Sequence, residues 1–583
     1  MRFLPTTREE MHRSGWRQAD IILISGDTYI DSPYIGVALI GRVLTAAGFK
    51  TAIIAQPDIN STADISRLGS PRLFWGVSGG SVDSMVANYT ALKKRRKSDD
   101  FTPGGKNTRR PDRAVIVYTN LIRKLQKETS RQAPIVLGGI EASLRRISHY
   151  DFWSNKVRRS ILFDARADIL LYGMAENSVV ELARALDKQQ NFRALPGLCY
   201  IGSQVPEHFT ELPSHKSVSM DKSAASRMFE EFYHNNDPLT AHGLAQLQDS
   251  RYLIQNPPAP YLETEELDKI HELPFSREVH PYYKRHGTVR ALSTIQAAIT
   301  THRGCYGECN FCAIAVHQGR TVRSRSEKSI LKEAEIISRQ PFFKGNILDV
   351  GGPTANMYGF ECARKLSKGP CRHRRCLTPE ICPNLKINHK RQLALLKKLR
   401  RLPGIKRVFV ASGIRYDMVM VGGQGREYLR EIVKHHVSGQ LKIAPEHCLD
   451  HVLAQMGKPR IKHLLEFKQL FDDQSRKAGK PQFLTYYFIA AHPGCTLKDM
   501  RDLKDFCRRY LHITPEQTQI FTPTPSTYST LMYWTGRDLK GNKIFCERDS
   551  KKKEAQKTAL INKKQKYDHN RRRGVQGRPA VRT

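Results

Sequence analysis

The chain alternates between short apolar runs and longer segments in which apolar residues recur at helical spacing. In the first third, five runs rich in branched apolar residues predict strands, at 20–25, 51–56, 114–118, 134–138 and 168–172. Residues 35–47 have the apolar spacing of a helix and precede Gly48, a residue that favours helix ends. Strands that alternate with helices are typical of a parallel sheet covered on its faces. We therefore expect a doubly wound α/β domain at residues 15–215.

The pattern weakens between residues 216 and 290, where helical pieces precede a proline-rich stretch. Pro257, Pro258 and Pro260 hold the chain in an extended form, because the proline ring fixes φ and removes the backbone donor. We interpret residues 216–290 as a helical and proline-rich connector.

A second series of strands and helices follows the connector. Its predicted strands lie at 297–303, 345–350, 406–411, 440–444, 483–489 and 518–522. Its predicted helices lie at 327–339, 389–402, 425–437, 461–477 and 497–510. This alternation predicts parallel β-α repeats, open or closed into a barrel, over residues 291–540. In such barrels the chemistry lies at the carboxyl ends of the strands.

Composition agrees with a soluble chain of more than one domain. With 583 residues, the chain exceeds what one hydrophobic core usually supports. No uninterrupted apolar stretch approaches the ~20 residues that span a bilayer. The first sixteen residues, MRFLPTTREEMHRSGW, carry charges where a signal peptide needs an apolar core. We expect a cytoplasmic protein without membrane contact.

The formal net charge of +39 is unevenly placed along the chain. Residues 548–583 are largely basic with few apolar side chains, which predicts a disordered basic tail. A second basic run, residues 93–97, opens a loop-like stretch that continues to Arg109 and Arg110. Both segments suit contact with the phosphates of RNA. A solvated charged surface explains them equally well.

Three of the twelve cysteines, Cys305, Cys309 and Cys312, have the spacing C-x3-C-x2-C. The alternative is that the three cysteines share one buried face of a helix. Gly304 and Gly307 disfavour a helix there and suit a tightly curved loop. Thiolates that converge from one loop need a cation, and a structural zinc site normally takes four ligands. Three ligands therefore favour an iron-sulfur cluster with one iron left open.

A second cysteine group lies further along the chain, at Cys362, Cys371, Cys376 and Cys382. Four soft ligands within a short segment suit zinc or an auxiliary iron-sulfur cluster. The irregular spacing matches no standard zinc motif, so reduced thiols without a metal are the alternative.

The triplet, with Phe311 before its last cysteine, resembles the signature of the radical S-adenosylmethionine (SAM) superfamily. The resemblance implies that Cys305, Cys309 and Cys312 hold a 4Fe-4S cluster and that Phe311 lies near the adenine of SAM. It also implies that the open iron binds SAM and that the reduced cluster cleaves it, giving a 5′-deoxyadenosyl radical that abstracts hydrogen. The substrate and the final product are not implied.

Later strand ends are similar to further SAM-binding elements of that superfamily. Gly351 and Gly352 resemble the Gly-Gly-Glu segment whose backbone receives the SAM amino group, with a proline in place of the acid. Ser412 and Arg415 resemble a Ser-x-x-Arg-x-Asp element, in which the arginine grips the SAM carboxylate.

Arg415 has two possible roles, and one further loop completes the predicted SAM site. Arg415 could instead form a structural ion pair with Asp417 or Glu446, and we weigh the two roles equally. The resemblance also places Pro493 and Gly494, in AAHPGCT, near the adenine.

The segments ISGDTYIDSPYIG, GGPTANMYG and AAHPGCT resemble the YgiQ-type family of radical SAM proteins over nearly the whole chain. The first domain resembles cobalamin-binding domains, but residues 31–36 carry Pro33 where an axial histidine would stand. We therefore prefer a scaffold that covers the active site over a cobalamin carrier.

The leading hypothesis is thus a radical SAM enzyme that receives its electron from a flavodoxin or ferredoxin. A nucleic-acid-binding protein with structural zinc-type cysteine clusters is the alternative. An electron carrier is a third possibility, but the chain is long for that role.

Overall fold

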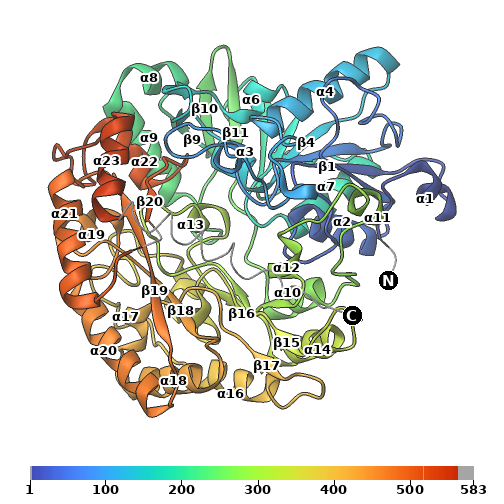
Figure 1. Ribbon diagram of the computed structural model, residues 1–583. Helices are drawn as coiled ribbons and strands as arrows, with labels where there is room; N and C mark the ends of the chain where they lie inside the picture. The colour runs from blue at the N-terminus through green and yellow to red at the C-terminus, as the bar shows by residue number, and fades with distance from the viewer. Residues whose placement is uncertain (1–2, 516–517, 562–583) are drawn as a thin grey trace, which may run out of the picture.

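The structure is a computed structural model that describes residues 3–515 and 518–561. Figure 1 shows the amino-terminal half as a sheet with helices, and the carboxyl-terminal half as an arc of strands with helices on its outer side. Among the described residues, no helix combines the length and the apolar character that a membrane crossing requires.

The first half is built on a nine-stranded sheet in the order β2-β1-β3-β4-β7-β8-β11-β10-β9. Strands β2, β1, β3, β4 and β7 are parallel, whereas β8 and β11 run antiparallel to their neighbours. The strands of this half are β1 (Ile21–Ser25), β2 (Thr51–Ala55), β3 (Phe74–Ser78), β4 (Ile135–Gly138), β5 (His149–Asp151), β6 (Lys156–Arg158), β7 (Ile169–Leu171), β8 (Leu198–Gly202), β9 (Thr210–Leu212), β10 (Leu244–Gln248) and β11 (Arg251–Gln255).

Helices cover both faces of this sheet and connect it to the second half. They are α1 (Arg8–Arg13), α2 (Gly36–Ala46), α3 (Ser84–Asn88), α4 (Ala114–Thr129), α5 (Gly139–Leu144), α6 (Ile161–Ala165), α7 (Glu176–Asp187), α8 (His215–Met220), α9 (Lys222–His234), α10 (Thr264–His271), α11 (Pro281–Lys284) and α12 (Leu292–Ile295).

Four of the five strands predicted in this half are confirmed, and the fifth is wrong. Residues 114–118 begin helix α4, in which buried Val115, Tyr118 and Ile122 recur at helical spacing. The run of branched residues suggested a strand only because its first turn is apolar on several sides. Among the strands that the sequence analysis missed is β3, which lies between β1 and β4 and is buried around Trp75.

The sheet also extends past residue 215, so that boundary of the predicted domain is too early. Strands β10 and β11, inside the expected connector, pair with β9 and β8. Their glutamines hid them in the sequence, because Gln246 and Gln248 are buried polar residues. Each side chain accepts a hydrogen bond from a backbone amide of the first domain, at Ser148 (2.9 Å) and Ser160 (2.8 Å).

The second half is a partial barrel whose strands follow one another in chain order. Backbone pairs are parallel between β12 and β16, between β15 and β17, and along β18-β19-β20. A bridge between Ile414 and Ile443 joins the third position of the barrel to the fourth. The strands are β12 (Ala298–Thr300), β13 (His302–Arg303), β14 (Arg323–Ser324), β15 (Asn346–Ile347), β16 (Asp349–Gly351), β17 (Arg407–Val408), β18 (Gln440–Glu446), β19 (Phe483–Ala490) and β20 (Thr518–Ile520).

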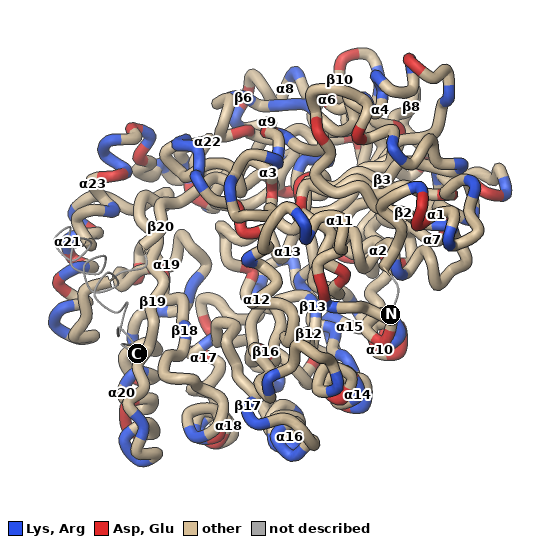
Figure 2. Tube along the Cα trace, turned by 45° about the vertical axis from the view of Figure 1, so that its right-hand side comes forward, with Lys and Arg blue, Asp and Glu red and all other residues tan. Residues whose placement is uncertain are grey.

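Helices on the outer side bury apolar faces against these strands (Figure 1). The helices of this half are α13 (Ile314–His317), α14 (Glu327–Ser338), α15 (Ala363–Lys368), α16 (Lys390–Leu399), α17 (Tyr416–Val419), α18 (Gly422–His435), α19 (Asp450–Met456), α20 (Lys462–Lys477), α21 (Leu497–Phe506), α22 (Tyr528–Thr535) and α23 (Ser550–Leu560). Figure 2 shows charged residues gathered along α14, α16, α18 and α20. The predicted strands and helices of the barrel are confirmed.

The predicted disordered tail is wrong for residues 548–561. Residues 550–560 form α23, whose amino end is capped by the Asp549 side chain accepting from Lys552 N at 2.8 Å. Leu560 is fully buried in the barrel core, and Gln556 is buried against the loop after β19. Burial of these two side chains orders α23, although the segment has a basic composition. Residues 562–583 lie outside the described residues.

Candidate active site

The cysteine triplet lies in the loop between β13 and α13, after the first strand of the barrel. The loop is not helical, and Gly304 turns it with φ +78°. A Cβ at Gly304 would lie 2.1 Å from Thr321 O, so no other residue fits there without movement. Cys312 N donates to Cys309 O at 2.9 Å, which curls the loop around its sulfurs.

Gly307 lies among the sulfur atoms of this loop. A Cβ on Gly307 would stand 3.2 Å from Cys305 Sγ, 3.6 Å from Cys309 Sγ and 3.4 Å from Arg415 Nη1. Burial raises the pKa of the Cys305 thiol, and it raises the pKa of Cys312 to about 12, with a further rise from the neighbouring thiols. Thiolates in this loop would therefore need a cation beside them.

The donor set of the triplet loop fits a 4Fe-4S core, because iron-sulfur clusters are held by cysteine thiolates. Three half-buried thiols from one loop suit such a core.

Arg415 is held beside the triplet by an acidic partner. Its Nε and Nη2 donate to the two oxygens of Asp417 at 2.8 and 2.7 Å, and its Nη1 lies 3.8 Å from Cys309 Sγ. The structural ion pair with Asp417 is therefore present, whereas Glu446 pairs with Lys458 at 3.5 Å. The ion pair leaves Nη1 directed at the triplet, and a role toward a carboxylate of SAM stays a prediction.

The ends of β16 and β17 meet at Asp349, which the sequence reasoning missed. Its carboxylate accepts from Ala411 N at 2.8 Å, from Ser412 N at 3.0 Å and from the Ser412 hydroxyl. A Cβ on Gly351 would lie 3.3 Å from the Ser412 side chain, so these two predicted site residues are adjacent. The signal was available in the sequence, because Asp349 stands two residues before Gly351 on a buried strand.

Gly352 lies against a histidine of β13, and Phe311 lies against a histidine of the loop after β19. A Cβ on Gly352 would lie 2.6 Å from the ring of His302, a buried residue whose pKa burial lowers to about 4. The ring of Phe311 meets that of His492 edge-on, with centroids 6.3 Å apart. His492 directly precedes Pro493, so Phe311 faces the loop predicted to lie near adenine.

That loop after β19 is itself fixed by local contacts. Gly494 has φ +87°, and its N donates to Phe545 O at 2.7 Å. His492 Nε2 lies 2.7 Å from the hydroxyl of Ser529 on α22. These contacts define the shape of the predicted adenine loop.

The second cysteine group is only partly brought together. Cys362, Cys376 and Cys382 are buried in one cluster against Tyr306 of the triplet loop. Cys371 is not part of that cluster, and its Sγ lies 2.9 Å from Nη1 of the neighbouring Arg364. The structure thus places three of the four thiols beside the triplet loop and leaves the fourth apart.

A cavity of about 500 Å³ lies between the two halves. Its walls include the carboxyl ends of β1, β3 and β4 on one side and Gly351, Gly352 and Ser412 on the other. Pro33 lines this cavity, so the loop of residues 31–36 offers no histidine nitrogen to a cobalt ion there.

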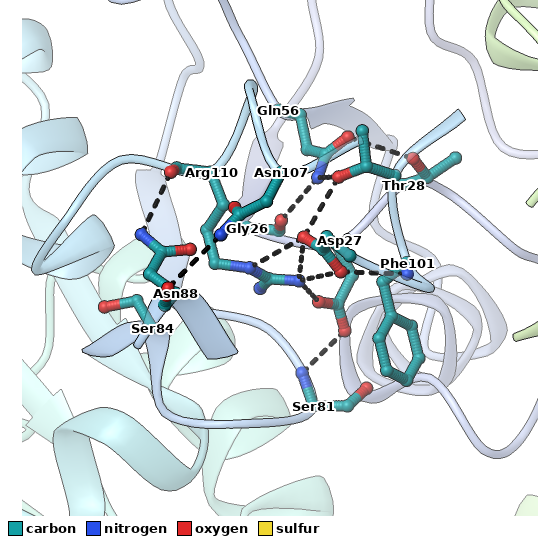
Figure 3. Close-up of polar contacts among 12 residues, drawn as sticks. Gly26, Asp27, Thr28, Gln56, Ser81, Ser84, Asn88, Phe101, Asn107 and Arg110 are labelled. Carbon is teal, nitrogen blue, oxygen red and sulfur yellow. Dashed lines mark hydrogen bonds and ion pairs between the residues drawn. The ribbon is translucent and has the colours of Figure 1, made fainter. Parts of the chain in front are cut away.

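The predicted basic stretch that begins at residue 93 ends at Arg110, which has a structural role. Arg110 is fully buried, forms an ion pair with Asp27 at 2.7 Å, and donates to Asp99 at 3.1 Å and to Gly79 O at 2.8 Å. Figure 3 shows its guanidinium pointing at Asp27, whose other oxygen accepts from Ser81 N at 2.6 Å. Arg110 itself lies outside the cavity lining, and these contacts leave it unavailable to a phosphate.

Two family models match this chain, the Radical SAM N-terminal model over residues 3–298 and the Radical SAM superfamily model over residues 299–507. The chain is therefore a radical SAM enzyme, and the matched domain implies a 4Fe-4S cluster and SAM as cofactors. UPF0313 protein FN0734 of Fusobacterium nucleatum is 56% identical over 566 residues, 97% of this chain and 99% of that protein. A UPF0313 protein of Thermotoga neapolitana is 48% identical over 568 residues, 96% and 99% of the two chains. The chain belongs to the UPF0313 family, which confirms the YgiQ-type resemblance.

Solved structures similar to this chain are more distant. TsrM of Kitasatospora setae, a radical SAM methyltransferase solved with cobalamin and a 4Fe-4S cluster, has a TM-score of 0.49 at 15% identity, covering 95% of this chain and 90% of that chain. The cobalamin-dependent radical enzyme OxsB has a TM-score of 0.46 at 13% identity, covering 90% and 56%.

Proposed function

We propose that this chain cleaves SAM reductively and starts hydrogen abstraction from a substrate. The observation that carries the proposal is the triplet loop, in which Gly307 leaves space between Cys305, Cys309 and the guanidinium of Arg415. When bound, a reduced 4Fe-4S cluster supplies the electron that splits SAM into methionine and a 5′-deoxyadenosyl radical.

The protein's own residues would hold and orient the two cofactors. Cys305, Cys309 and Cys312 would each bind one iron through sulfur. Arg415, already ordered by Asp417, would offer Nη1 to the SAM carboxylate. This division of roles explains why a buried arginine faces a group of thiols.

Three further elements would surround the rest of SAM. The backbone of Gly351 and Gly352, supported by the Asp349–Ser412 contact, would receive the amino group. Phe311 would contact the adenine together with the loop at Pro493 and Gly494. A flavodoxin or ferredoxin is the proposed electron donor, because the chemistry needs one electron at low potential.

The test is anaerobic reconstitution with iron and sulfide, followed by dithionite and SAM. The wild-type chain should produce 5′-deoxyadenosine, and Cys309→Ala should produce none while keeping its circular dichroism spectrum, because the residue lies in a loop outside the core. Cys546→Ala, at a half-buried cysteine far along the chain, is the matched control and should retain the product. Equal product from Cys309→Ala and wild type would disprove the assignment of that ligand.

A further inference from the structure

The cavity between the halves is far larger than the voids of an ordinary protein core. Packed interiors leave few holes bigger than a water molecule. Here about 500 Å³ lies open between the sheet and helices α2 and α7, lined by Leu23, Phe74 and Val136 from the strands and by Ile40 and Val179 from the helices. A pocket of this size and lining is typical of a site for a drug-sized molecule.

Buried polar atoms in the wall of this cavity are without partners. His271 is buried, and neither of its ring nitrogens has a hydrogen-bond partner. Glu176, also buried, pairs with Arg303 through Oε1, whereas its Oε2 has no partner. Because buried polar groups are nearly always satisfied, these atoms indicate hydrogen bonds to a molecule that enters the cavity.

The charges of the wall argue against an anionic ligand. Among the described lining residues the carboxylates are Asp27, Glu176 and Asp349, and the one guanidinium, Arg303, is already paired with Glu176. Asp27 is neutralised by Arg110 from outside the lining. A phosphate or sulfonate would enter without a counter-charge, at a high desolvation cost.

We propose that this cavity binds a neutral, largely apolar small molecule that carries N–H or O–H groups. The donors of the ligand would meet Oε2 of Glu176, and a ring nitrogen of His271 would take a second polar contact. The same cavity reaches Gly352 and Ser412, so the ligand would lie beside the proposed SAM loops. Its role as the substrate of the radical reaction rests on the proposed function, whereas its binding does not.

The binding test uses two dyes that share one ring system. N-phenyl-1-naphthylamine is neutral, and 8-anilinonaphthalene-1-sulfonate carries an anionic group on the same scaffold. Fluorescence titration of the full chain should show saturable binding of the neutral dye at one site, at least about tenfold tighter than the anionic dye.

Two isoleucine variants locate the site. Ile140, half-buried in the first turn of α5, lines the cavity, whereas Ile116, also half-buried, on α4, does not. Ile140→Trp should weaken the neutral dye by at least about tenfold, and Ile116→Trp should leave its affinity unchanged. Absent saturation, an unaltered affinity in Ile140→Trp, or a preference for the anionic dye would each overturn the proposal.

The same variants separate this proposal from the proposed function. Ile140→Trp should still form 5′-deoxyadenosine from SAM without substrate, because the triplet loop is untouched. If the chain binds the neutral dye as expected but never cleaves SAM, the cavity stands and the radical function fails. If SAM is cleaved and the dye does not bind, the reverse holds.

Discussion

Single residues decide the geometry of the triplet loop, and Gly307 is the clearest case. A glycine there is favoured by the limited space and not by backbone conformation, because its φ is not in the left-handed region. The two sulfurs and the guanidinium that surround it are the groups that a bound cluster would have to accommodate.

Gly307→Ala should therefore lower the iron content of the reconstituted protein, because its methyl group would stand 3.2 Å from Cys305 Sγ and 3.4 Å from Arg415 Nη1. Iron and sulfide assays with absorption spectroscopy measure the effect, and we expect less than about half of the wild-type iron, a loss of ~0.5 kcal/mol or more in cluster affinity. Gly423→Ala is the matched control, since nothing lies within 4 Å of its added Cβ. Equal iron in all three proteins would show that the loop has spare room.

Residues of the site differ in how far the sequence predicts them. The triplet, Phe311 and Arg415 belong to short sequence motifs, so the sequence alone predicts them. Arg110 belongs to a local basic run, yet its partner Asp27 lies 83 residues away (110 − 27 = 83), so no local pattern reveals their ion pair. This long-range pairing gives Arg110 a structural role, and the predicted RNA contact of the other basic residues stays a prediction.

At the scale of elements, the sequence analysis predicted the strands of the barrel and four strands of the first sheet, but it misjudged three segments. Helix α4 begins with a run of branched apolar residues that resembles a strand. Strand β10 contains buried glutamines, so its sequence resembles that of a connector. Helix α23 was hidden by its charge, because only one face of it is buried. In all three cases a tertiary partner, absent from the local sequence, decides the structure.

Leu560→Ala tests whether α23 belongs to the folded barrel. Leu560 is fully buried in the barrel core, so its truncation should lower the free energy of unfolding by about 2–5 kcal/mol, measured by urea denaturation. Lys551→Ala, at an exposed position of the same helix, should change it by less than ~0.5 kcal/mol. A variant of Leu560 as stable as wild type would mean that α23 does not pack there.

Lys553 makes the stability contributed by α23 dependent on pH. Burial beside Tyr533 and Phe152, with Lys93 nearby, lowers the pKa of Lys553 from 10.5 to about 8. The folded state therefore holds a costly charge at every pH below about 8, and that cost is relieved as the pH rises from about 8 to 10.5.

Lys553→Met removes this titration, so the stability of wild type relative to the variant should rise between pH 8 and 10.5 and stay constant below pH 8. The expected gain is at least about 1 kcal/mol, from urea denaturation of both proteins across that range. A stability difference that is flat from pH 7 to 10.5 would show that Lys553 is not buried as a cation.

At the scale of the whole molecule, the two halves complete each other. Tyr528, Leu531 and Trp534 of α22 pack into the core cluster of the amino-terminal sheet. Ser526, just before α22, donates to Leu144 O at 2.8 Å. A carboxyl-terminal helix thus belongs to the amino-terminal core, which explains why domain boundaries drawn along the sequence only approximate the structure.

The Glu176–Arg303 ion pair joins the halves beside the cavity, and it should behave as a buried pair. The Glu176 side chain is 3% exposed and the Arg303 side chain 11% exposed. Glu176→Gln therefore leaves the buried Arg303 cation without its partner. We expect a loss of about 3 kcal/mol in the free energy of unfolding of the apoprotein, measured by urea denaturation.

Glu176→Gln combined with Arg303→Met removes both charges and should be more stable than Glu176→Gln alone. Glu181→Gln, in the exposed pair with Arg184, is the control and should change stability by less than ~0.5 kcal/mol. If the double variant is the least stable of the three, the pair is not an isolated buried pair, and the junction depends on other contacts of Arg303.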